Sequence, residues 1–417
     1  MAAPKPDLRL PLDRARKIFL AAQGLPPRNG RPPARLLEDT GFVRTLGGVD
    51  VYLAVRARKP GLRREDLDSA VAERAAQVVP SVRGCIYLVP RRDVPLALRV
   101  ADLLSRTRSE REHEKAGIRP GEVEEVGQAV VQVLAERGPL TTDALRRALP
   151  DGVVRSLGEA GKKVGISSAL PPALRLLEFE GRVERVLEGR RLDSERYLWR
   201  IVDESPFGEA DLPDDPIDLY ASLAEIFFRT AGLGTQKDFA AWAGISQRDA
   251  KEAMERIPLR PVAIEEVGEM HWILEELRDL PEIAEEAAQA VALLPFEDNI
   301  TALHGGANLL VDPAYHDIRV PSWGSSKPST LGESRHMEMR AVVADGRIVG
   351  FWEYDPDARE VATGYFDTVS TATEDRVRAA AEDLARFITG DLGHGRSFNL
   401  DTDDELRQRA AYVRKMG

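Results

Sequence analysis

The chain has 417 residues, of which 43% are hydrophobic and 30% charged, and this length suggests two to four domains. No apolar run approaches the roughly 20 residues that a membrane-spanning helix needs, and the opening segment lacks the apolar core of a secretory signal, so we expect a cytoplasmic protein with no membrane partner. The single cysteine, Cys85, excludes an internal disulfide and a Cys-based zinc site, and the six histidines form no HExxH motif, so we expect no metal.

The net charge of −11 is distributed unevenly along the chain. Residues 1–120 carry 24 Lys and Arg against 14 Asp and Glu, a balance of +10, whereas residues 121–417 carry 34 against 55, a balance of −21. A basic first third beside an acidic remainder is typical of a protein that presents one face to a polyanion such as nucleic acid. The alternative is a solvated charged surface on a chain in which Arg is simply abundant.

The first domain, residues 1–120, is predicted to contain helices followed by a strand. Helical spacing of apolar residues indicates the helices, and a short apolar run between Gly84 and Pro90 indicates the strand. The predicted helices are Arg14–Gln23, 35–43, 49–59 and Glu65–Val78, and the predicted strand is Cys85–Val89.

The next two domains, 121–210 and 211–285, are predicted to share one element order. In each, three helices precede a β-hairpin, with Thr141 capping a helix of the first and Thr235 and Ser246 capping helices of the second. Three helices followed by a two-stranded wing are typical of a winged helix. We therefore expect tandem winged helices that resemble each other in element order only.

The last domain, 286–417, is predicted to be rich in strands. The dipeptide Asp345-Gly346 lies between apolar runs and favours a hairpin, and an amphipathic helix that ends at Gly390 follows. The charged segment from about Ser397 is expected to be poorly ordered. The predicted fold class is α+β, with tandem winged-helix domains followed by a β-rich carboxy-terminal domain.

Five segments resemble, in the same order, motifs of the AlkZ/YcaQ-like family of bacterial winged-helix DNA glycosylases, over about residues 12–390. They are RKIFLAAQGL (Arg16–Leu25), LGGVDVYLAVRAR (Leu46–Arg58), RGCIYLVPRRD (Arg83–Asp93), LGTQKDFAAWAGIS (Leu233–Ser246) and LLPFEDN (Leu293–Asn299). The resemblance implies a C-shaped arrangement around double-stranded DNA, with the catalytic motif in the amino-terminal winged helix. It also implies hydrolysis of the N-glycosidic bond of alkylated bases, in some members within bulky adducts or interstrand crosslinks.

The chain departs from the family at the catalytic motif. The family's polar-x-polar motif, usually Gln-x-Gln or Gln-x-Asp, is Asp50-Val51-Tyr52 here, and the His and Thr of its RGTLH segment are Tyr87 and Cys85. One hypothesis is a monofunctional glycosylase that acts on alkylated or crosslinked DNA and needs no metal or redox cofactor. The second is a non-catalytic winged-helix DNA-binding protein, a regulator or lesion sensor, and the third is a protein-interaction module. The sequence predicts no oligomeric state.

Asp50 and Tyr52 are the candidate catalytic residues. Breaking the base–sugar bond develops positive charge on the deoxyribose, which the Asp50 carboxylate could stabilise while it deprotonates a water, and Tyr52 could orient that water or a phosphate. The alternatives are that Asp50 is only an N-cap or first-turn anion and that Tyr52 is a core residue. Side chains at i and i+2 point nearly oppositely on a helix, so both can serve one site only if the backbone around Gly47-Gly48 is not regular helix.

The candidate DNA contacts are arginines of the Pro/Gly loop, the motif region and the first hairpin. They are Arg28, Arg31, Arg56, Arg58, Arg83, Arg182, Arg185, Arg190 and Arg191. A basic wing can follow the phosphate backbone without reading the sequence, so we expect residues 1–120 and the 182–200 hairpin to face DNA and the protein to associate with the nucleoid. Tyr87 is either a packing residue or a residue that lines the DNA pocket. The alternative for each arginine is a local carboxylate partner.

Overall fold

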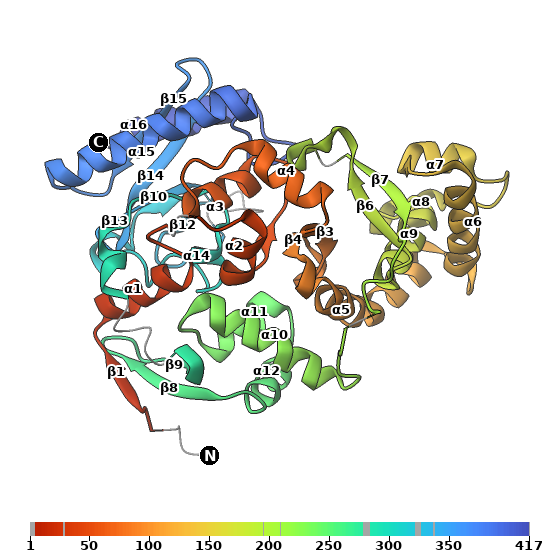
Figure 1. The fold of residues 1–417 in the computed structure, drawn as a ribbon, viewed down its shortest axis with the longest axis horizontal. Helices are drawn as coiled ribbons and strands as arrows, with labels where there is room; N and C mark the ends of the chain where they lie inside the picture. Colours follow the sequence, from red (N-terminus) through yellow and green to blue (C-terminus); the bar gives the residue numbers. More distant parts are fainter. Residues whose placement is uncertain are drawn as a thin grey trace.

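The fold of this chain mixes α-helices with small β-sheets (Figure 1). The computed structural model describes residues 5–27, 30–194, 196–208, 210–277, 284–321, 327–336 and 338–416. Within these ranges no helix is both long and apolar enough to span a bilayer.

The amino-terminal elements surround a three-stranded antiparallel sheet of order β2-β4-β3. In chain order the elements are β1 (Leu8–Leu10), α1 (Leu12–Ala22), α2 (Pro33–Thr40), β2 (Val43–Arg44), α3 (Asp50–Arg58), α4 (Arg64–Ala72), β3 (Ala76–Pro80), a 3₁₀ turn (Val82–Gly84), β4 (Ile86–Pro90) and α5 (Val94–Ala116). The predicted helix Glu65–Val78 is wrong at its end. Arg74 has a positive φ of 60°, which stops the helix, and Ala76–Pro80 pairs with β4 instead.

The middle of the chain forms two sets of helices, each followed by a hairpin. The first set is α6 (Glu122–Arg137), β5 (Leu140–Thr141), α7 (Thr142–Ala148), α8 (Gly158–Val164), α9 (Leu170–Phe179), β6 (Val183–Leu187) and β7 (Tyr197–Ile201). The second set is α10 (Pro216–Ala231), α11 (Gln236–Ala243), α12 (Gln247–Met254), β8 (Leu259–Ile264) and β9 (Met270–Leu274).

Local signals in the middle of the chain are confirmed. The hydroxyls of Thr141, Thr235 and Ser246 each accept a backbone N–H of the helix that they precede. The sequence did not predict the pairing of β1 with β8. The two strands run parallel and join the start of the chain to the second hairpin.

The carboxy-terminal part is built on a four-stranded sheet of order β10-β13-β14-β15. Its elements are β10 (Ala292–Leu293), α14 (Asn299–Ala302), β11 (Arg319–Val320), β12 (Ser329–Thr330), β13 (Arg340–Ala344), β14 (Arg347–Asp355), β15 (Glu360–Tyr365), α15 (Thr371–Phe387), a π-helical turn (Ile388–Leu392) and α16 (Asp403–Arg414). The predicted Asp345-Gly346 hairpin connects β13 and β14. The expectation of a poorly ordered end is wrong, since α16 packs on β14 and β15 and buries Leu406, Ala410 and Val413.

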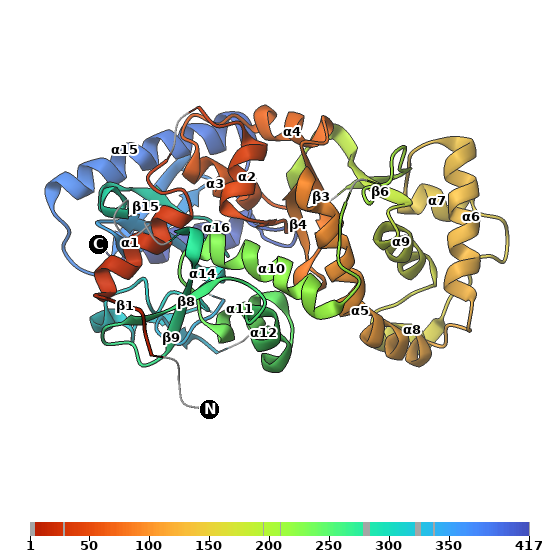
Figure 2. The same ribbon diagram turned by 60° about the horizontal axis from the view of Figure 1, so that its bottom comes forward.

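The hydrophobic cores join segments that are far apart in the sequence. One core combines Phe19 of α1 with Val262 of β8 and Phe351 of β14, and another combines residues of α3 with the carboxy-terminal sheet and α15. In both views the α6–α9 segment lies at the opposite end of the molecule from α15 (Figures 1 and 2). Helix α3, which carries the candidate motif, is therefore held against the carboxy-terminal sheet.

Candidate functional site

Asp50 is the first residue of α3 and takes part in a buried ion pair. Asp50 is 6% exposed, and Nη2 of Arg340, on β13, donates a hydrogen bond to its Oδ1 at 2.9 Å. Val49 is the N-cap of α3, and no side chain caps the helix. Asp50 is thus a first-turn anion, which the helix dipole favours, but its main partner lies on a distant strand rather than in its own helix.

The ion pair of Asp50 belongs to a chain of five alternating charges. Arg340 also donates to Glu353 at 2.7 Å, Glu353 accepts from Arg409 at 2.6 Å, and Arg409 contacts Asp401 at 2.8 Å. With three carboxylates and two guanidinium groups, this network of five side chains has a net charge of −1. Burial raises the pKa of Asp50 to about 6, against the opposing effects of Arg340 and Ser397, so that Asp50 is mostly ionised at neutral pH.

The segment before α3 is fixed by close backbone contact. The backbone N–H of Val49 donates to the carbonyl of Arg396 at 2.9 Å. A Cβ on Gly48 would lie 2.2 Å from the carbonyl carbon of Ser397, so only glycine allows this approach. The motif and the segment before α16 are therefore packed as one unit.

Tyr52 is fully buried and does not join Asp50 at one site. Its hydroxyl donates to Asp68 Oδ1 at 2.6 Å and accepts the backbone N–H of Leu192 at 2.8 Å, while burial and Asp68 raise its pKa. Both motif residues lie in regular helix, so their side chains point to different partners. Tyr52 is in the core, as the alternative interpretation expected.

Arg58 is a structural anchor in a buried contact. Its side chain is 3% exposed and donates to both oxygens of Asp298, at 2.8 and 2.6 Å. It also donates to the carbonyl of Gln23 at 2.9 Å, which ties α1, α3 and the LLPFEDN segment together. The prediction that Arg58 contacts DNA is wrong in this structure, because its hydrogen bonds are made inside the protein.

The LLPFEDN segment supplies the other polar groups beside α3. Asp298 accepts the backbone N–H of Ile300 at 2.9 Å as the N-cap of α14, and Asn299 Nδ2 donates to the carbonyls of Thr40 and Phe42, each at 3.0 Å. These contacts hold the segment rigidly against the amino-terminal sheet.

Glu297, in the same segment, has a positive φ of 51° and a side chain only 6% exposed. His336 Nδ1 lies 2.5 Å from its Oε1, and Arg44 forms an ion pair with its Oε2. Sequence reasoning did not single out either Glu297 or His336. The LLPFEDN motif was a signal for Glu297, but no sequence pattern pointed to His336.

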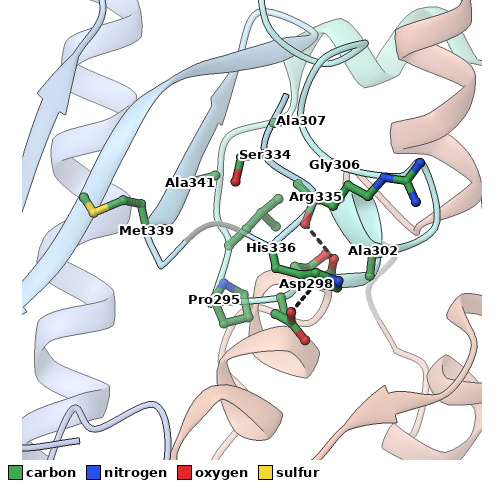
Figure 3. A pocket seen from close by; sticks show the side chains of 13 residues that line it. Pro295, Asp298, Ala302, Gly306, Ala307, Ser334, Arg335, His336, Met339 and Ala341 are labelled. Atoms are coloured by element: carbon green, nitrogen blue, oxygen red, sulfur yellow. Dashed lines mark hydrogen bonds and ion pairs between the residues drawn. The ribbon is translucent and has the colours of Figure 1, made fainter. Parts of the chain in front are cut away.

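Glu297 and Asp298 contribute to two small adjoining pockets. One is also lined by Asp50, and the other by Arg335 and His336, with the latter drawn in Figure 3. Each has a free volume of about 10 Å³, which is about the space of one water. Asp50 Oδ2 is buried and has no hydrogen-bond partner among the described residues.

The candidate arginines near the motif are mostly engaged within the protein. Arg31 pairs with a carboxylate of α2 and Arg56 with one of α15 at 2.6 Å, while the Arg56 guanidinium lies 4.2 Å from the ring centroid of Phe387. Arg83, whose φ is 57°, donates to the hydroxyl of the buried Tyr87 at 3.2 Å. Arg28 lies outside the described residues.

The hairpin arginines divide into paired and exposed groups. Arg185 binds Glu178 through two hydrogen bonds of 2.7 and 2.9 Å, and Arg182 pairs loosely with an exposed glutamate at 3.3 Å. Nε and Nη2 of Arg191 donate hydrogen bonds to the two carboxylate oxygens of Asp193, at 2.9 and 2.5 Å. Arg190, at the turn, is exposed and has a positive φ of 58°. Arg190 is therefore better placed than Arg185 or Arg191 to contact a ligand.

No group of three or more His, Cys, Asp or Glu side chains in the described ranges is arranged to hold a metal ion. The histidine of the site, His336, has a carboxylate and arginines as neighbours instead.

The chain belongs to the DNA glycosylase AlkZ-like family, whose model matches residues 45–387. Among solved structures it is similar to the Streptomyces sahachiroi DNA glycosylase AlkZ, with a TM-score of 0.68 and 17% sequence identity over 91% of this chain and 97% of that one. At this identity the likeness shows a shared fold. A comparison with curated proteins gave no match. The resemblance found in the sequence is confirmed, and the family supports a DNA glycosylase-like function in DNA repair.

Proposed function

We propose that the chain binds double-stranded DNA and hydrolyses the N-glycosidic bond of an alkylated base. Its membership of the glycosylase family supports the class of reaction. The observation that carries the proposal is the pocket beside the start of α3, where the carboxylates of Asp50, Glu297 and Asp298 come together at the position of the family's motif.

Asp50 is the carboxylate that we assign to transition-state stabilisation. Asp298 is matched by Arg58 and Glu297 by Arg44, whereas Asp50 shares Arg340 with Glu353, so its network keeps a negative charge. A negative charge in a water-poor site favours the positive charge that develops on the deoxyribose. Asp50 has a raised pKa and lines a pocket, which is a frequent property of functional carboxylates.

We assign DNA contact to residues 1–120 and to the hairpin of β6 and β7, within tandem winged helices that surround the duplex in a C-shaped arrangement. The element order of three helices and a hairpin, which occurs after α6 and again in α10–α12 with β8 and β9, supports the winged-helix assignment. We assign the second of these sets a scaffold role, because Glu265, Glu266 and Glu269 of its hairpin region would repel phosphate. The exposed Arg190 at the first hairpin turn has the chemistry that a phosphate contact requires.

The test is single-turnover excision of N7-methylguanine from a defined duplex with enzyme in excess. The wild type should release the base, and Asp50→Asn should do so on the order of 10² times more slowly while DNA affinity stays unchanged. Asp375→Asn is the matched control, because Asp375 is exposed on α15 and pairs only with a helical neighbour in the described structure. Excision by Asp50→Asn at the wild-type rate would remove Asp50 from the reaction.

A second candidate function is non-catalytic DNA binding. The full burial of Tyr52 favours it, because this member of the motif is bound to Asp68 and Leu192 and is not available to substrate. Salt-dependent binding of unmodified duplex without excision would support this second function. If the protein neither bound duplex DNA nor excised the base, a protein-interaction module would be favoured.

A further inference from the structure

We propose that His336, oriented by Glu297, is a further catalytic residue that takes the proton from the water attacking the sugar. The inference rests on the proposed glycosylase function and extends it to a residue outside the family's motif. Neither motif residue offers an accessible base, since Asp50 is 6% exposed and Tyr52 is fully buried, whereas the side chain of His336 is 43% exposed.

The contact between His336 and Glu297 has the geometry of an oriented base. Nδ1 of His336 lies 2.5 Å from Oε1 of Glu297, and a carboxylate accepts hydrogen bonds, so Nδ1 carries the proton. In that tautomer, Nε2 is the nitrogen that takes up a proton during reaction. Hydrogen bonding of one imidazole nitrogen to a carboxylate, with the other acting as base, is a recurring arrangement in hydrolases.

Glu297 is itself held in place from two directions. Arg44 of β2 pairs with the second carboxylate oxygen, and the adjoining Asp298 is fixed by Arg58 and caps α14. A non-glycine residue at a φ of 51° is costly and persists only where its surroundings enforce it, which is frequent at functional sites. Glu297 acts as a positioning residue because His336, rather than Glu297, lies at the exposed side of the pair.

The pair lies where the reaction of the proposed function would take place. Glu297 lines both small pockets, the one that includes Asp50 and the one that includes His336. Figure 3 shows His336 and Asp298 in the second of these pockets. Glu297 therefore borders the pocket of Asp50 as well as the pocket of His336.

Burial and the nearby arginines together lower the pKa of His336. Desolvation lowers its pKa most, followed by Arg83 of the 3₁₀ turn, Arg44 of β2 and the adjacent Arg335. A neutral ring at pH 7 can act as a base, and Glu297 then compensates the imidazolium that forms.

The step balances without any further reactant. The bond between C1′ and the alkylated, positively charged base breaks, and its electron pair leaves with the base, which becomes neutral. The water oxygen bonds to C1′, and one proton of that water passes to Nε2 of His336. The products are the free base, an abasic deoxyribose and a protonated His336, which returns its proton to solvent.

The experiment compares excision of N7-methylguanine from duplex DNA by the wild type, His336→Ala and Glu297→Gln. The rate of His336→Ala should fall by about 10² or more and rise again when imidazole is added, because an exposed position admits the small base. Glu297→Gln should lower the rate and shift the acid limb of the rate–pH profile to lower pH, since the imidazolium loses its carboxylate. His113→Ala, on the distant end of α5, is the control and should match the wild type.

Two outcomes would overturn the inference while leaving the proposed function intact. One is excision by His336→Ala at the wild-type rate. The other is a loss that imidazole does not restore, which would indicate a contact to DNA or a structural role. Absence of excision by the wild type would instead refute the proposed function, and the His336 assignment with it.

Discussion

Two buried groups should give this protein opposite dependences of stability on pH. Asp50 has a pKa raised to about 6, chiefly by burial. His304, buried with its ring centroid 4.0 Å from that of Phe19, has a pKa lowered to about 3, by burial and by the neighbouring His271. Neither ring nitrogen of His304 has a hydrogen-bond partner in the part of the chain that the structure describes.

The signs of the two effects follow from proton uptake in the folded and unfolded states. The raised pKa of Asp50 contributes stability below its ordinary value of 3.8, and this contribution is lost as the pH rises through about 6. The lowered pKa of His304 contributes stability above its ordinary value of 6.5, and this contribution is lost as the pH falls toward about 3. Between about pH 4 and 6, each group changes the free energy of unfolding by about 1.4 kcal/mol per pH unit. The two changes have opposite signs and cancel.

Single substitutions should therefore reveal slopes that the wild type conceals. As the pH rises from about 4 to 6, the free energy of unfolding of Asp50→Asn should increase by about 3 kcal/mol relative to that of the wild type. The reason is that the variant has no carboxyl whose stabilising protonated form is lost over this range. As the pH falls from about 6 to 4, the free energy of unfolding of His304→Leu should increase by a similar amount relative to that of the wild type.

The measurement is urea unfolding of the three proteins at several pH values in this window, followed by circular dichroism and tryptophan fluorescence. Differences between variant and wild type remove the titration of other groups that the substitution does not touch. Parallel curves for Asp50→Asn and the wild type would show that the Asp50 carboxyl is not shifted, and the argument from its burial would then be wrong.

The remaining predictions concern arginines that the sequence grouped together. Arg58→Met should lower the free energy of unfolding by about 3–5 kcal/mol, because it leaves Asp298 buried without a counter-charge, and should leave the salt dependence of DNA binding unchanged in a titration of affinity against salt. Arg190→Ala should flatten that salt slope by up to about one unit without changing the thermal midpoint, whereas Arg191→Ala should lower the midpoint, since Arg191 holds Asp193. An unchanged slope for Arg190→Ala would remove the hairpin turn from the DNA interface.

The elements that the sequence predicted correctly depend on contacts between near neighbours. Thr141, Thr235 and Ser246 cap their helices through hydrogen bonds to residues three positions ahead. Asp345-Gly346 makes a tight hairpin because its two residues adopt the positive φ values that the turn requires. Such signals are complete within a few residues, and the family resemblance added the order in which the segments occur.

The roles of the site residues depend on partners that no local pattern contains. Asp50 meets Arg340 across 290 positions of sequence, and His336 meets Glu297 across 39. Helix α4 ends early because β3 pairs with β4, although the apolar spacing continues the helical pattern to Val78. Helical or strand propensity is a weak preference that tertiary pairing overrides, and ion pairs between distant segments exist only after those segments have packed. The sequence by itself therefore determined the caps, the hairpin turns and the order of the family's motifs. Only the tertiary structure decided that Asp50 is a buried, paired carboxylate, that Arg58 is an internal anchor, and that His336 and Glu297 lie together beside the motif.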